Sequence, residues 1–475
     1  MNVLIINTNR NHFPMPVIPL GACMVAESAE RAGHAVQLLD LAFYRDPLQA
    51  VRTALKKNAP DVVGLSVRNI DNNDIQSPAF YIKDVAGIVD VIRSVTPAPI
   101  VMGGAAVSVM PEELLRYTGA SVAVLGDGEA VFPRLLGELS RKRLPHAVPG
   151  TAWIEQGAFR ANPCISSDNG CSSASPDFSR WIHLKAYLSR LSTIPVQTKL
   201  GCQFACVYCT YRKIEGSRYR LSHPGEVADT VCRLGSQGLR HIEFVDNVFN
   251  SPYDHALAIC ENIARRRPDV SLQSLELNPL FIDDALLSGM ERAGFSGIGI
   301  TVESASDHVL EGLKKGFTSA QVHKAAEVVR RHTLPCVWIF MMGGPNETRE
   351  TAMETIRFAE TAIRPKDVAF FGLGIRIYPG TELESIAREQ GLLLLPPSEI
   401  LEPVFYVSPT VACDWMLKQV KTAMNGHMNF MNSESLSLPV LSPIQRIAYR
   451  LGLSSPLWKH TRFIRRGLRL FGMEA

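Results

Sequence analysis

The sequence lacks an excess of charge of either sign, a long apolar run and an ordered cysteine framework. Its 475 residues include 49 basic and 46 acidic ones, a net charge of +3, so the chain as a whole is not expected to bind nucleic acid. No apolar stretch is long and uncharged enough to predict a transmembrane helix. The chain begins directly with a strand-like run, which predicts that it carries no signal peptide.

The ten cysteines are scattered and do not show the spacing of a disulfide framework. We therefore expect most of them to be reduced, in a cytoplasmic protein. Four lie in apolar periodic segments and are expected to be small core residues: Cys23, Cys232, Cys260 and Cys336. The chain is too long for one ordinary hydrophobic core, so two or three domains are expected.

Residues 1–140 alternate short β-branched runs with helical patterns, which is typical of a parallel α/β sheet covered on both faces. The expected strands are Val3–Asn7, Val36–Asp40, Val62–Val67, Ile100–Gly103 and Val122–Leu125. Five such strands fit a doubly wound, flavodoxin-like or Rossmann-like order, with a ligand over their carboxyl ends. No G-x-G-x-x-G motif opens the first helix, so a dinucleotide is not expected.

Polar residues and glycines follow these strands at their carboxyl ends. Adjacent glycines there would let the backbone approach a large flat ligand closely. The candidate ligand contacts are Asn7, Ser66, Arg68, Gly103, Gly104, Gly126 and Glu129. The polar loop of residues 69–80 is either solvated or part of a ligand or substrate site at the domain junction.

Residues 141–193 change character and predict a surface linker, whose Cys164 and Cys171 have no ligand-like spacing. Strand and helix patterns alternate again over residues 194–395. The expected strands there are Pro195–Leu200, His241–Val245, Leu272–Leu277, Gly297–Val302, Cys336–Met342 and Ala369–Ile377. They predict an open, partial (β/α)6 TIM-like barrel with its active site at the carboxyl ends of the strands. Residues 396–475 predict a small, mostly helical segment.

The first expected barrel strand leads into the segment Gly-Cys-Gln-Phe-Ala-Cys-Val-Tyr-Cys. Cys202, Cys206 and Cys209 form a C-x-x-x-C-x-x-C run, and three thiolates this close on one loop can hold three irons of a cubane cluster. Such clusters normally take four thiolates, so one iron could stay open to a ligand such as S-adenosylmethionine (SAM). A structural zinc site is the alternative, with His223 or Cys232 as fourth ligand, although neither has the usual spacing.

This cysteine run, with Tyr208 before its last thiol, resembles the radical SAM superfamily. Other segments resemble the cobalamin-binding domain found before many radical SAM domains: Pro19-Leu20-Gly21, Ala32-Gly33-His34, Met102-Gly103-Gly104 and Gly126-Asp127-Gly128-Glu129. That family commonly has Gly-Glu-Gly-Glu in the last segment, so Asp127 is a departure. The resemblance implies three cofactors: a [4Fe–4S] cluster on the three cysteines, SAM, and cobalamin held by the candidate contacts of the first sheet.

The D-x-H-x-x-G motif of many cobalamin proteins is absent. The resemblance then implies cobalamin with its own base displaced and without a histidine ligand. His12 in the first loop could be argued as a ligand, although a lone loop histidine is more often solvated. The alternative for this domain is an α/β module that has lost its ligand.

The same resemblance assigns SAM contacts to Tyr208, Asp246, Glu303, Gly343 and Arg376. Asp246 stands where other members hold the amino group of SAM; alternatively it caps the next helix. Glu303 is expected to contact the ribose or the amino acid portion of SAM. Arg376 is either a contact of the SAM carboxylate or part of a structural ion pair.

Domains of this kind most often methylate an unactivated carbon of a small molecule, here a natural product or lipid, by way of a 5′-deoxyadenosyl radical and methylcobalamin. The resemblance also implies an external electron donor of the flavodoxin or ferredoxin type. Oxidative cyclisation or rearrangement without methyl transfer is one alternative. A cobalamin-binding sensor with a vestigial barrel is another, and the intact cysteine run argues against it.

The last stretch, residues 458–471, carries five Lys and Arg residues among apolar ones. It predicts a basic amphipathic helix, placed either at a membrane surface or against the barrel as a solvated terminal helix.

Overall fold

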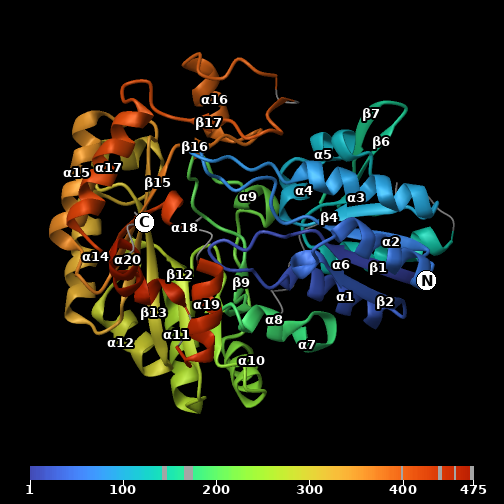
Figure 1. Ribbon diagram of the computed structural model, residues 1–475, viewed down its shortest axis with the longest axis horizontal. Coiled ribbons are helices and arrows are strands. Elements are labelled where there is room, and N and C mark those ends of the chain that lie inside the picture. Colours follow the sequence, from blue (N-terminus) through green and yellow to red (C-terminus); the bar gives the residue numbers. More distant parts are fainter. Residues whose placement is uncertain (142–146, 165–174, 397–398, 437–440, 454–455, 471–475) are drawn as a thin grey trace.

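The computed structural model describes residues 1–141, 147–164, 175–396, 399–436, 441–453 and 456–470. Two seven-stranded sheets organise these residues, one in each half of the molecule (Figure 1). Cys171 lies outside the described residues. Within them, no helix combines the length and the apolar character needed to cross a membrane.

The first sheet has the order β2-β1-β3-β4-β5-β6-β7, and its first five strands confirm the expected flavodoxin-like order. The strands are β1 (Asn2–Asn7), β2 (Ala35–Asp40), β3 (Val62–Ser66), β4 (Ile100–Gly103), β5 (Val122–Val124), β6 (Thr151–Glu155) and β7 (Ala158–Ala161). The helices are α1 (Leu20–Arg31), α2 (Pro47–Asn58), α3 (Ile82–Val95), α4 (Ala105–Val109), α5 (Pro111–Thr118) and α6 (Gly128–Ser140). Helix α1 packs on α6 and α2 packs on α3, so helices cover both faces.

Alternation along β1 shows why this sheet is doubly covered. Val3 and Ile5 belong to one buried cluster, and Leu4 and Ile6 belong to another. Successive side chains of a strand point to opposite faces, so an uninterrupted apolar run needs a helix layer on each side. The parallel register sets Asn7 beside Ser66 and Ser66 beside Gly103. These candidate residues therefore share one edge of the sheet.

The segment expected to be a linker contains a hairpin that extends the first sheet. Strands β6 and β7 pair antiparallel across Gln156 and Gly157, and β6 pairs antiparallel with β5. Gln156 and Gly157 have φ of 49° and 81°, as a two-residue hairpin turn requires. Helices α7 (Phe178–Trp181) and α8 (Leu184–Leu188) follow. Residues 141–193 are therefore a linker only in part.

The second sheet is parallel and has the order β18-β15-β14-β13-β12-β11-β8. Its strands are β8 (Ile194–Val196), β11 (His241–Phe244), β12 (Ser271–Leu277), β13 (Phe295–Glu303), β14 (Cys336–Met342), β15 (Val368–Leu373) and β18 (Phe430–Asn432). Its main helices are α10 (Pro224–Ser236), α11 (Tyr253–Arg266), α12 (Asp284–Ala293), α14 (Ser319–Arg331), α15 (Arg349–Ala362) and α17 (Cys413–Gly426). Six strands match the expected barrel, and β18 adds a seventh from the segment expected to be mostly helical.

The remaining elements join or cover these layers. They are α9 (Tyr211–Ile214), α13 (Asp307–Gly312), α16 (Glu382–Glu389), β16 (Ile375–Arg376), β17 (Phe405–Tyr406), α18 (Ser433–Leu436), α19 (Leu441–Arg450), the 3-10 turn η5 (Leu457–His460) and α20 (Thr461–Leu470). The turn η5 lies against β13, where Lys459 donates to Ser296 Oγ at 2.6 Å. A Cβ at Gly297 would come within 2.8 Å of the Trp458 ring. The C-terminal segment thus packs on the barrel.

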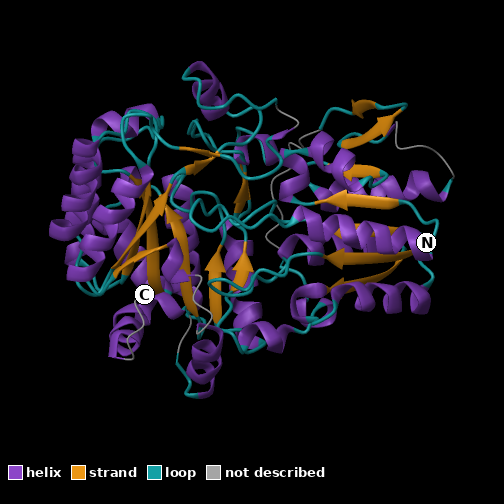
Figure 2. Ribbon diagram, turned by 45° about the horizontal axis from the view of Figure 1, so that its top comes forward, coloured by secondary structure: helices purple, strands orange, loops and turns teal. Residues whose placement is uncertain are grey.

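One buried cluster runs through both halves of the molecule, from Val3 in β1 to Phe430 in β18. The five parallel strands of the first sheet, β1 to β5, point toward the barrel (Figure 2). Their carboxyl ends therefore meet the barrel at the junction between the two halves.

Candidate functional site

A cavity of about 1020 Å³ lies where the carboxyl edge of the first sheet meets the barrel. The loop after β1 contributes residues 8–14, and the loop after β3 contributes Arg68 and Asn69. The cysteine loop contributes Tyr208 and Cys209, and β14 and β15 form the opposite wall. Ligand cavities typically reach about 1000 Å³, so this one has room for more than one small group.

The cysteine loop is fastened where it begins and ends. Strands β9 (Lys199–Leu200) and β10 (Arg220–Leu221) pair antiparallel at its base. Gly201 has φ of 88°, and a Cβ there would collide with the carbonyl oxygen of Arg218, so only glycine fits. The N–H of Cys202 donates to the Gly216 carbonyl at 3.1 Å. These contacts fix the loop that carries the three thiols.

The three thiols share one electrostatic setting. Burial raises the pKa of Cys202, Cys206 and Cys209, that of Cys209 to about 12, while the charge of Lys315 acts in the opposite direction on all three. None of them forms a disulfide. A thiolate here needs a bound cation to stabilise it, as metal coordination does. The donor set therefore fits an iron–sulfur cluster.

The two residues suggested as the fourth ligand of a zinc site belong to helix α10 or to its cap. His223 Nδ1 accepts from the N–H of Gly225 at 3.1 Å and so caps α10, which also carries Cys232. Across the described ranges, no three His, Cys, Asp or Glu side chains gather closely enough to hold a single metal ion. His223 thus already serves as the cap of α10, and Cys232 lies within that helix.

Glu303 and Tyr208 meet beside the cysteine loop. The Tyr208 hydroxyl donates to Glu303 Oε1 at 2.8 Å, and Lys315 Nζ lies 2.8 Å from Glu303 Oε2 and donates to the Tyr208 hydroxyl at 3.2 Å. Glu303 has φ of 60° at an irregularity in the pairing of β13 and β14. A non-glycine residue in this strained conformation is a common feature of functional sites. The structure thus joins two of the predicted SAM contacts in one network.

Asp246 is held inside the protein. Its carboxylate accepts from the N–H and hydroxyl of Thr198 at 2.7 and 2.6 Å and from the N–H of Lys199 at 3.2 Å, and it lies 3.4 Å from Lys199 Nζ. The side chain is fully buried and fastens the chain just before the cysteine loop. These contacts are not those of a cap on the next helix, and a contact of Asp246 with the amino group of SAM stays a prediction.

Arg376 takes part in an ion pair between the two halves. Its Nε donates to Asp71 Oδ2 at 2.8 Å, and both side chains are almost completely buried. Its other nitrogens donate to backbone carbonyls, those of Ile377 and Ile400 among them. The structural alternative for Arg376 is therefore present in the structure.

The other predicted SAM contact, Gly343, lies in a tight turn after β14 with φ of 95°. Its N–H donates to Glu347 Oε2 at 2.8 Å, and burial raises the pKa of Glu347 to about 7. Thr348 caps α15. The carboxyl of Glu347 thus fixes the turn that contains Gly343.

The seven candidate contacts of the first sheet divide by location. Arg68 is exposed and lines the cavity. Asn7 donates to Asp40 at 2.8 Å, and the Ser66 carbonyl accepts from Thr8. Gly104 is required by the protein itself, because a Cβ there would lie 2.5 Å from the Val67 carbonyl oxygen. Of the remaining candidates, Gly103 is the last residue of β4, and Gly126 and Glu129 follow β5 at the same edge.

The loop after β1 also brings His12 to the cavity. Its Nε2 lies 2.7 Å from the Ala42 carbonyl, and burial lowers its pKa. A neutral imidazole held through one nitrogen retains the other as a possible acceptor. Asp127, the departure from the family motif, forms a bidentate ion pair with Arg220 of β10. This pair ties the first sheet to the base of the cysteine loop.

Sequence reasoning missed Glu276 near the end of β12. Burial raises its pKa to about 8, with the negative charge of Glu303 acting in the same direction. Its charge also contributes to a raised pKa of Tyr211, after burial, which places it close to the cysteine loop. The signal was present: Glu276 is the one charged residue of the strand Ser271–Leu277, and it stands between two leucines.

Each half of the chain matches a known protein family. The radical SAM superfamily matches residues 196–359, and the B12 binding domain matches residues 6–136. The uncharacterized methyltransferase PH0819 of Pyrococcus horikoshii is 29% identical over 384 residues, which cover 79% of this chain and 80% of that protein. Tryptophan 2-C-methyltransferase of Streptomyces laurentii is 24% identical over 451 residues, covering 82% and 74%. Hopanoid C-3 methylase of Methylococcus capsulatus is 26% identical over 380 residues, covering 77% and 67%.

A solved structure supports the whole architecture. The radical SAM methyltransferase TsrM of Kitasatospora setae, with cobalamin and a [4Fe-4S] cluster bound, superposes with a TM-score of 0.86 at 23% identity. The alignment covers 99% of this chain and 98% of that one. The fold is therefore shared from the first sheet to the C-terminal helices.

Proposed function

Since the chain belongs to the radical SAM superfamily and carries a B12-binding domain in front of its barrel, we propose that it is a C-methyltransferase acting on an unactivated carbon of a small molecule. One observation carries the proposal. The loop with the three cysteines and the carboxyl edge of the cobalamin-type sheet open into the same cavity. A methyl donor held by one half and a reacting substrate activated by the other would meet there.

The chain's own residues hold and orient the groups. Cys202, Cys206 and Cys209 would hold the cluster. The cluster and SAM together supply a substrate radical, and cobalamin supplies the methyl group. Glu303 and Tyr208 lie beside the cysteines, where a carboxylate would accept hydrogen bonds from the ribose or ammonium of SAM. We propose SAM contacts for Gly343 and Asp246 as well, as the sequence assigned. Arg376 would either donate to the SAM carboxylate or serve as the structural partner of Asp71.

For cobalamin we propose the edge formed by Asn7, Ser66, Arg68, Gly103, Gly104, Gly126 and Glu129. The parallel register supports it, because strand ends β1, β3 and β4 are aligned there. Arg68 points its positive charge at the junction cavity. We place the cobalamin module within residues 1–140 extended by the β6–β7 hairpin, the barrel at 194–395, and a substrate-shaping region in 396–475.

Two further partners belong to the proposal. An external electron donor of the flavodoxin or ferredoxin type would reduce the cluster. Exposed Arg212, Lys213 and Arg218 flank the cysteine loop and offer such an acidic protein a basic contact. Reduced thiols and a reduced electron donor suit a cytoplasmic location. The substrate is a natural product or a lipid, the two classes that the names of the relatives acting on tryptophan and on hopanoids exemplify.

The test is anaerobic reconstitution with iron, sulfide and hydroxocobalamin, followed by turnover with SAM and a reductant. Mass spectrometry reads the ratio of S-adenosylhomocysteine to 5′-deoxyadenosine. We expect both products. Deoxyadenosine alone would contradict methylation and favour a cyclisation or rearrangement. Bound zinc with neither product would contradict the proposal that the protein is an enzyme. Cys206→Ala should abolish both products and iron binding, whereas Cys232→Ala, in α10, should leave both intact.

A further inference from the structure

The charge of the chain is unevenly distributed. Residues 435–473 contain seven Lys and Arg residues and no Asp or Glu, a net charge of +7. The whole chain carries +3, so the remaining residues together carry −4. Such an asymmetry indicates an electrostatic partner for the basic segment.

Helix α19 shows two distinct faces. Leu441, Gln445 and Ala448 are buried against the protein. Away from this face Ile447 and Leu451, the latter just past the helix end, are 57% and 73% exposed. Two exposed arginines, Arg446 and Arg450, flank these apolar side chains one turn apart. An apolar strip bordered by arginine is the pattern of a helix that lies in a membrane interface.

Helix α20 repeats the arrangement. Thr461, Arg465 and Leu468 face inward, and Arg465 donates to the carbonyls of His427 and Phe430. Phe463 is 78% exposed between exposed Arg462 and Arg466. A structural arginine is thus turned inward, while Phe463 and its two arginine neighbours remain at the surface.

Figure 1 shows α19 and α20 in the barrel half of the molecule. Lys459 of η5, just before α20, is held on Ser296 of β13. The two helices together expose Ile447, Leu451 and Phe463 and four arginines: Arg446, Arg450, Arg462 and Arg466. Isolated exposed apolar side chains are ordinary, but several of them ringed by one sign of charge mark an interaction site.

Helix α19 also borders the junction cavity. Gln445 donates to the carbonyl of Pro14, which lines that cavity. Burial lowers the pKa of Arg190 and the adjacent charge of Arg446 lowers it further, so the two guanidiniums are neighbours. Arg190 in turn stacks on Phe43, its guanidinium carbon 4.5 Å from the ring centroid, and its charge lowers the pKa of His12 in the cavity wall, after burial. Positive charge therefore continues from α19 to the cavity.

We propose that α19 and α20 form a docking surface for an anionic lipid bilayer, and that the cavity accordingly takes a lipid substrate from that bilayer. Ile447, Leu451 and Phe463 would enter the acyl boundary, and the four arginines would contact lipid phosphates. The docking step is independent of catalysis. Only the assignment of substrate class rests on the proposed methyltransferase function, which it narrows from small molecules to membrane lipids.

The test is vesicle cosedimentation of the reconstituted full-length protein. Phosphatidylcholine vesicles are compared with vesicles that also contain phosphatidylglycerol, each over a range of NaCl concentrations. We expect binding to the anionic vesicles that weakens with salt. Each basic residue near such a surface contributes about 1 kcal/mol, so R446E/R450E should weaken binding roughly tenfold or more. I447E/L451E should do the same through the apolar contribution.

Matched controls exist elsewhere on the surface. Leu394 is 87% exposed after α16, and Arg357 is exposed on α15, so L394E and R357E make the same chemical changes outside the proposed surface and should bind as the wild type does. Equal thermal unfolding of all variants shows that each is folded. The salt dependence of wild-type binding tests the electrostatic contribution without any variant.

Several results would overturn the proposal. The wild type could fail to bind anionic vesicles, or it could bind neutral vesicles equally well. Both double variants could also bind as the wild type does. A dimer in analytical ultracentrifugation that I447E/L451E dissociates would instead assign the surface to a second copy of the chain. Vesicle binding needs no SAM, so its loss leaves the test of methyl transfer unaffected. The protein could bind anionic vesicles and yet methylate a water-soluble substrate and no lipid. That result would refute the lipid substrate and leave the docking surface in place.

Discussion

The hydroxyl of Tyr208 links the cysteine loop to the end of β13. It donates to Glu303 and accepts from Lys315, so three side chains from three segments converge beside Cys206 and Cys209. Holding Glu303 at φ of 60° costs on the order of 1–3 kcal/mol for a non-glycine residue. The network supplies the contacts that keep it there, and this makes Tyr208 a positioning residue for Glu303.

We expect Tyr208→Phe to lower the rate of SAM consumption about 10-fold or more, because a hydrogen bond to a charged group contributes roughly 1.5–3 kcal/mol. Iron content per chain should not change, since the ring and the thiols remain. Tyr211→Phe is the control: it is also next to the cysteines, but its hydroxyl makes no hydrogen bond among the described residues. Full activity of Tyr208→Phe, or loss of iron, would contradict the positioning role.

Glu276 predicts a pH effect on the protein without cofactors. Its pKa is about 8 in the folded protein, against roughly 4.3 for an unfolded glutamate. The unfolded chain therefore releases this proton at lower pH, and folding loses stability as pH rises from about 4 through 8. Glu276→Gln should raise the free energy of unfolding by about 1–2 kcal/mol at pH 8 and have little effect at pH 5, as measured with urea.

The control for that measurement is Glu360→Gln, an exposed carboxylate on α15, which should change stability equally little at both pH values. If Glu276→Gln destabilised the protein at pH 8, the carboxylate would be charged and compensated in the folded state. The pKa argument would then fail.

Among the elements, those that follow a simple period were predictable and those made by tertiary contact were not. β1, β3 and β4 have continuous apolar runs, and their predicted ends differ from the observed ones by one residue at most. β18 is three residues long and gains its place only by pairing with β15, which no local pattern encodes. The hairpin β6–β7 had a local signal, a Gln-Gly turn between two strand-like runs, that a composition-based linker assignment overlooked.

The site divides in the same way. The spacing of Cys202, Cys206 and Cys209 predicted one loop and the structure has it. The partners of Asp246 and Arg376, by contrast, come from residues that are 48 and 305 positions away along the chain. Sequence spacing reveals ligands that share a loop, but it does not reveal which distant segment satisfies a buried charge.

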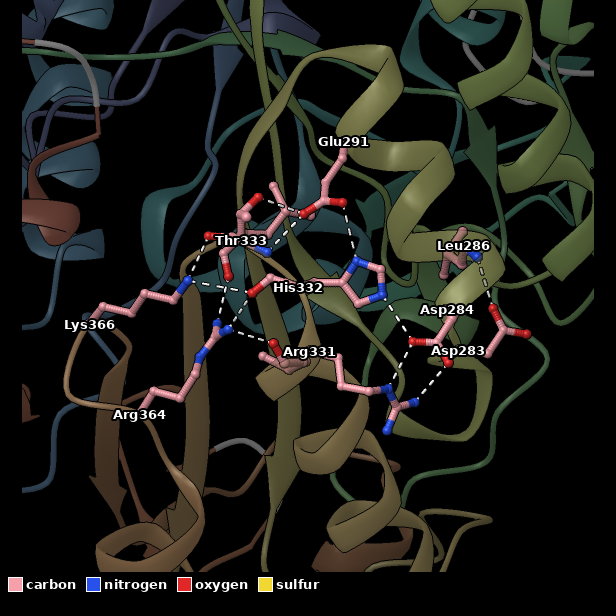
Figure 3. Close-up of polar contacts among 11 residues, drawn as sticks. Asp283, Asp284, Leu286, Glu291, Arg331, His332, Thr333, Arg364 and Lys366 are labelled. Carbon is pink, nitrogen blue, oxygen red and sulfur yellow. Dashed lines mark hydrogen bonds and ion pairs between the residues drawn. The ribbon is translucent and has the colours of Figure 1, made fainter.

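A network of hydrogen bonds and ion pairs lies at the amino ends of the barrel strands (Figure 3). His332 presents its ring nitrogens to Asp284 and Glu291 at 3.0 and 3.2 Å, and Glu291 also accepts from the N–H of Thr333 at 2.9 Å. Burial opposes charge on Glu291, but the hydrogen bonds from Thr333 and His332 lower its pKa overall. At this end of a barrel such residues serve stability rather than chemistry.

We expect Glu291→Ala to lower the free energy of unfolding by about 1 kcal/mol at pH 7, through its lost hydrogen bonds. A carboxyl with a lowered folded-state pKa stabilises the fold above its unfolded pKa and stops doing so as pH falls. The difference from wild type should therefore shrink below about pH 4. The control is Glu354→Ala on the exposed face of α15, which should have little effect on stability at either pH. Neither variant should change turnover. A gap that widens in acid would contradict the assignment.

At the scale of the whole molecule, two ion pairs fasten the first sheet to the barrel. Asp71 pairs with Arg376 at the cavity wall, and Asp127 pairs with Arg220 at the base of the cysteine loop. Tyr378 adds a hydrogen bond to Asn73 at 3.0 Å. Both pairs join a loop after a first-sheet strand to a segment that carries or adjoins the site, so the width of the cavity depends on them.

We expect Asp71→Asn to lower the free energy of unfolding by about 3 kcal/mol, because it leaves a buried guanidinium without its counter-charge. Urea denaturation measures this loss. Glu112→Gln breaks an exposed pair with Arg116 and should cost at most about 1 kcal/mol. Equal midpoints for the two variants would mean that the Asp71–Arg376 pair does not hold the halves together.

The same variant decides between the two roles of Arg376. If the guanidinium is a structural partner, Asp71→Asn loosens the cavity wall, and equilibrium binding of SAM to the reconstituted protein weakens or stays the same. If Arg376 instead serves the SAM carboxylate, removing its competing acid frees the positive charge and SAM should bind more tightly. Four of its hydrogen bonds go to backbone carbonyls, which hold it in place without Asp71. We therefore expect no gain in SAM affinity.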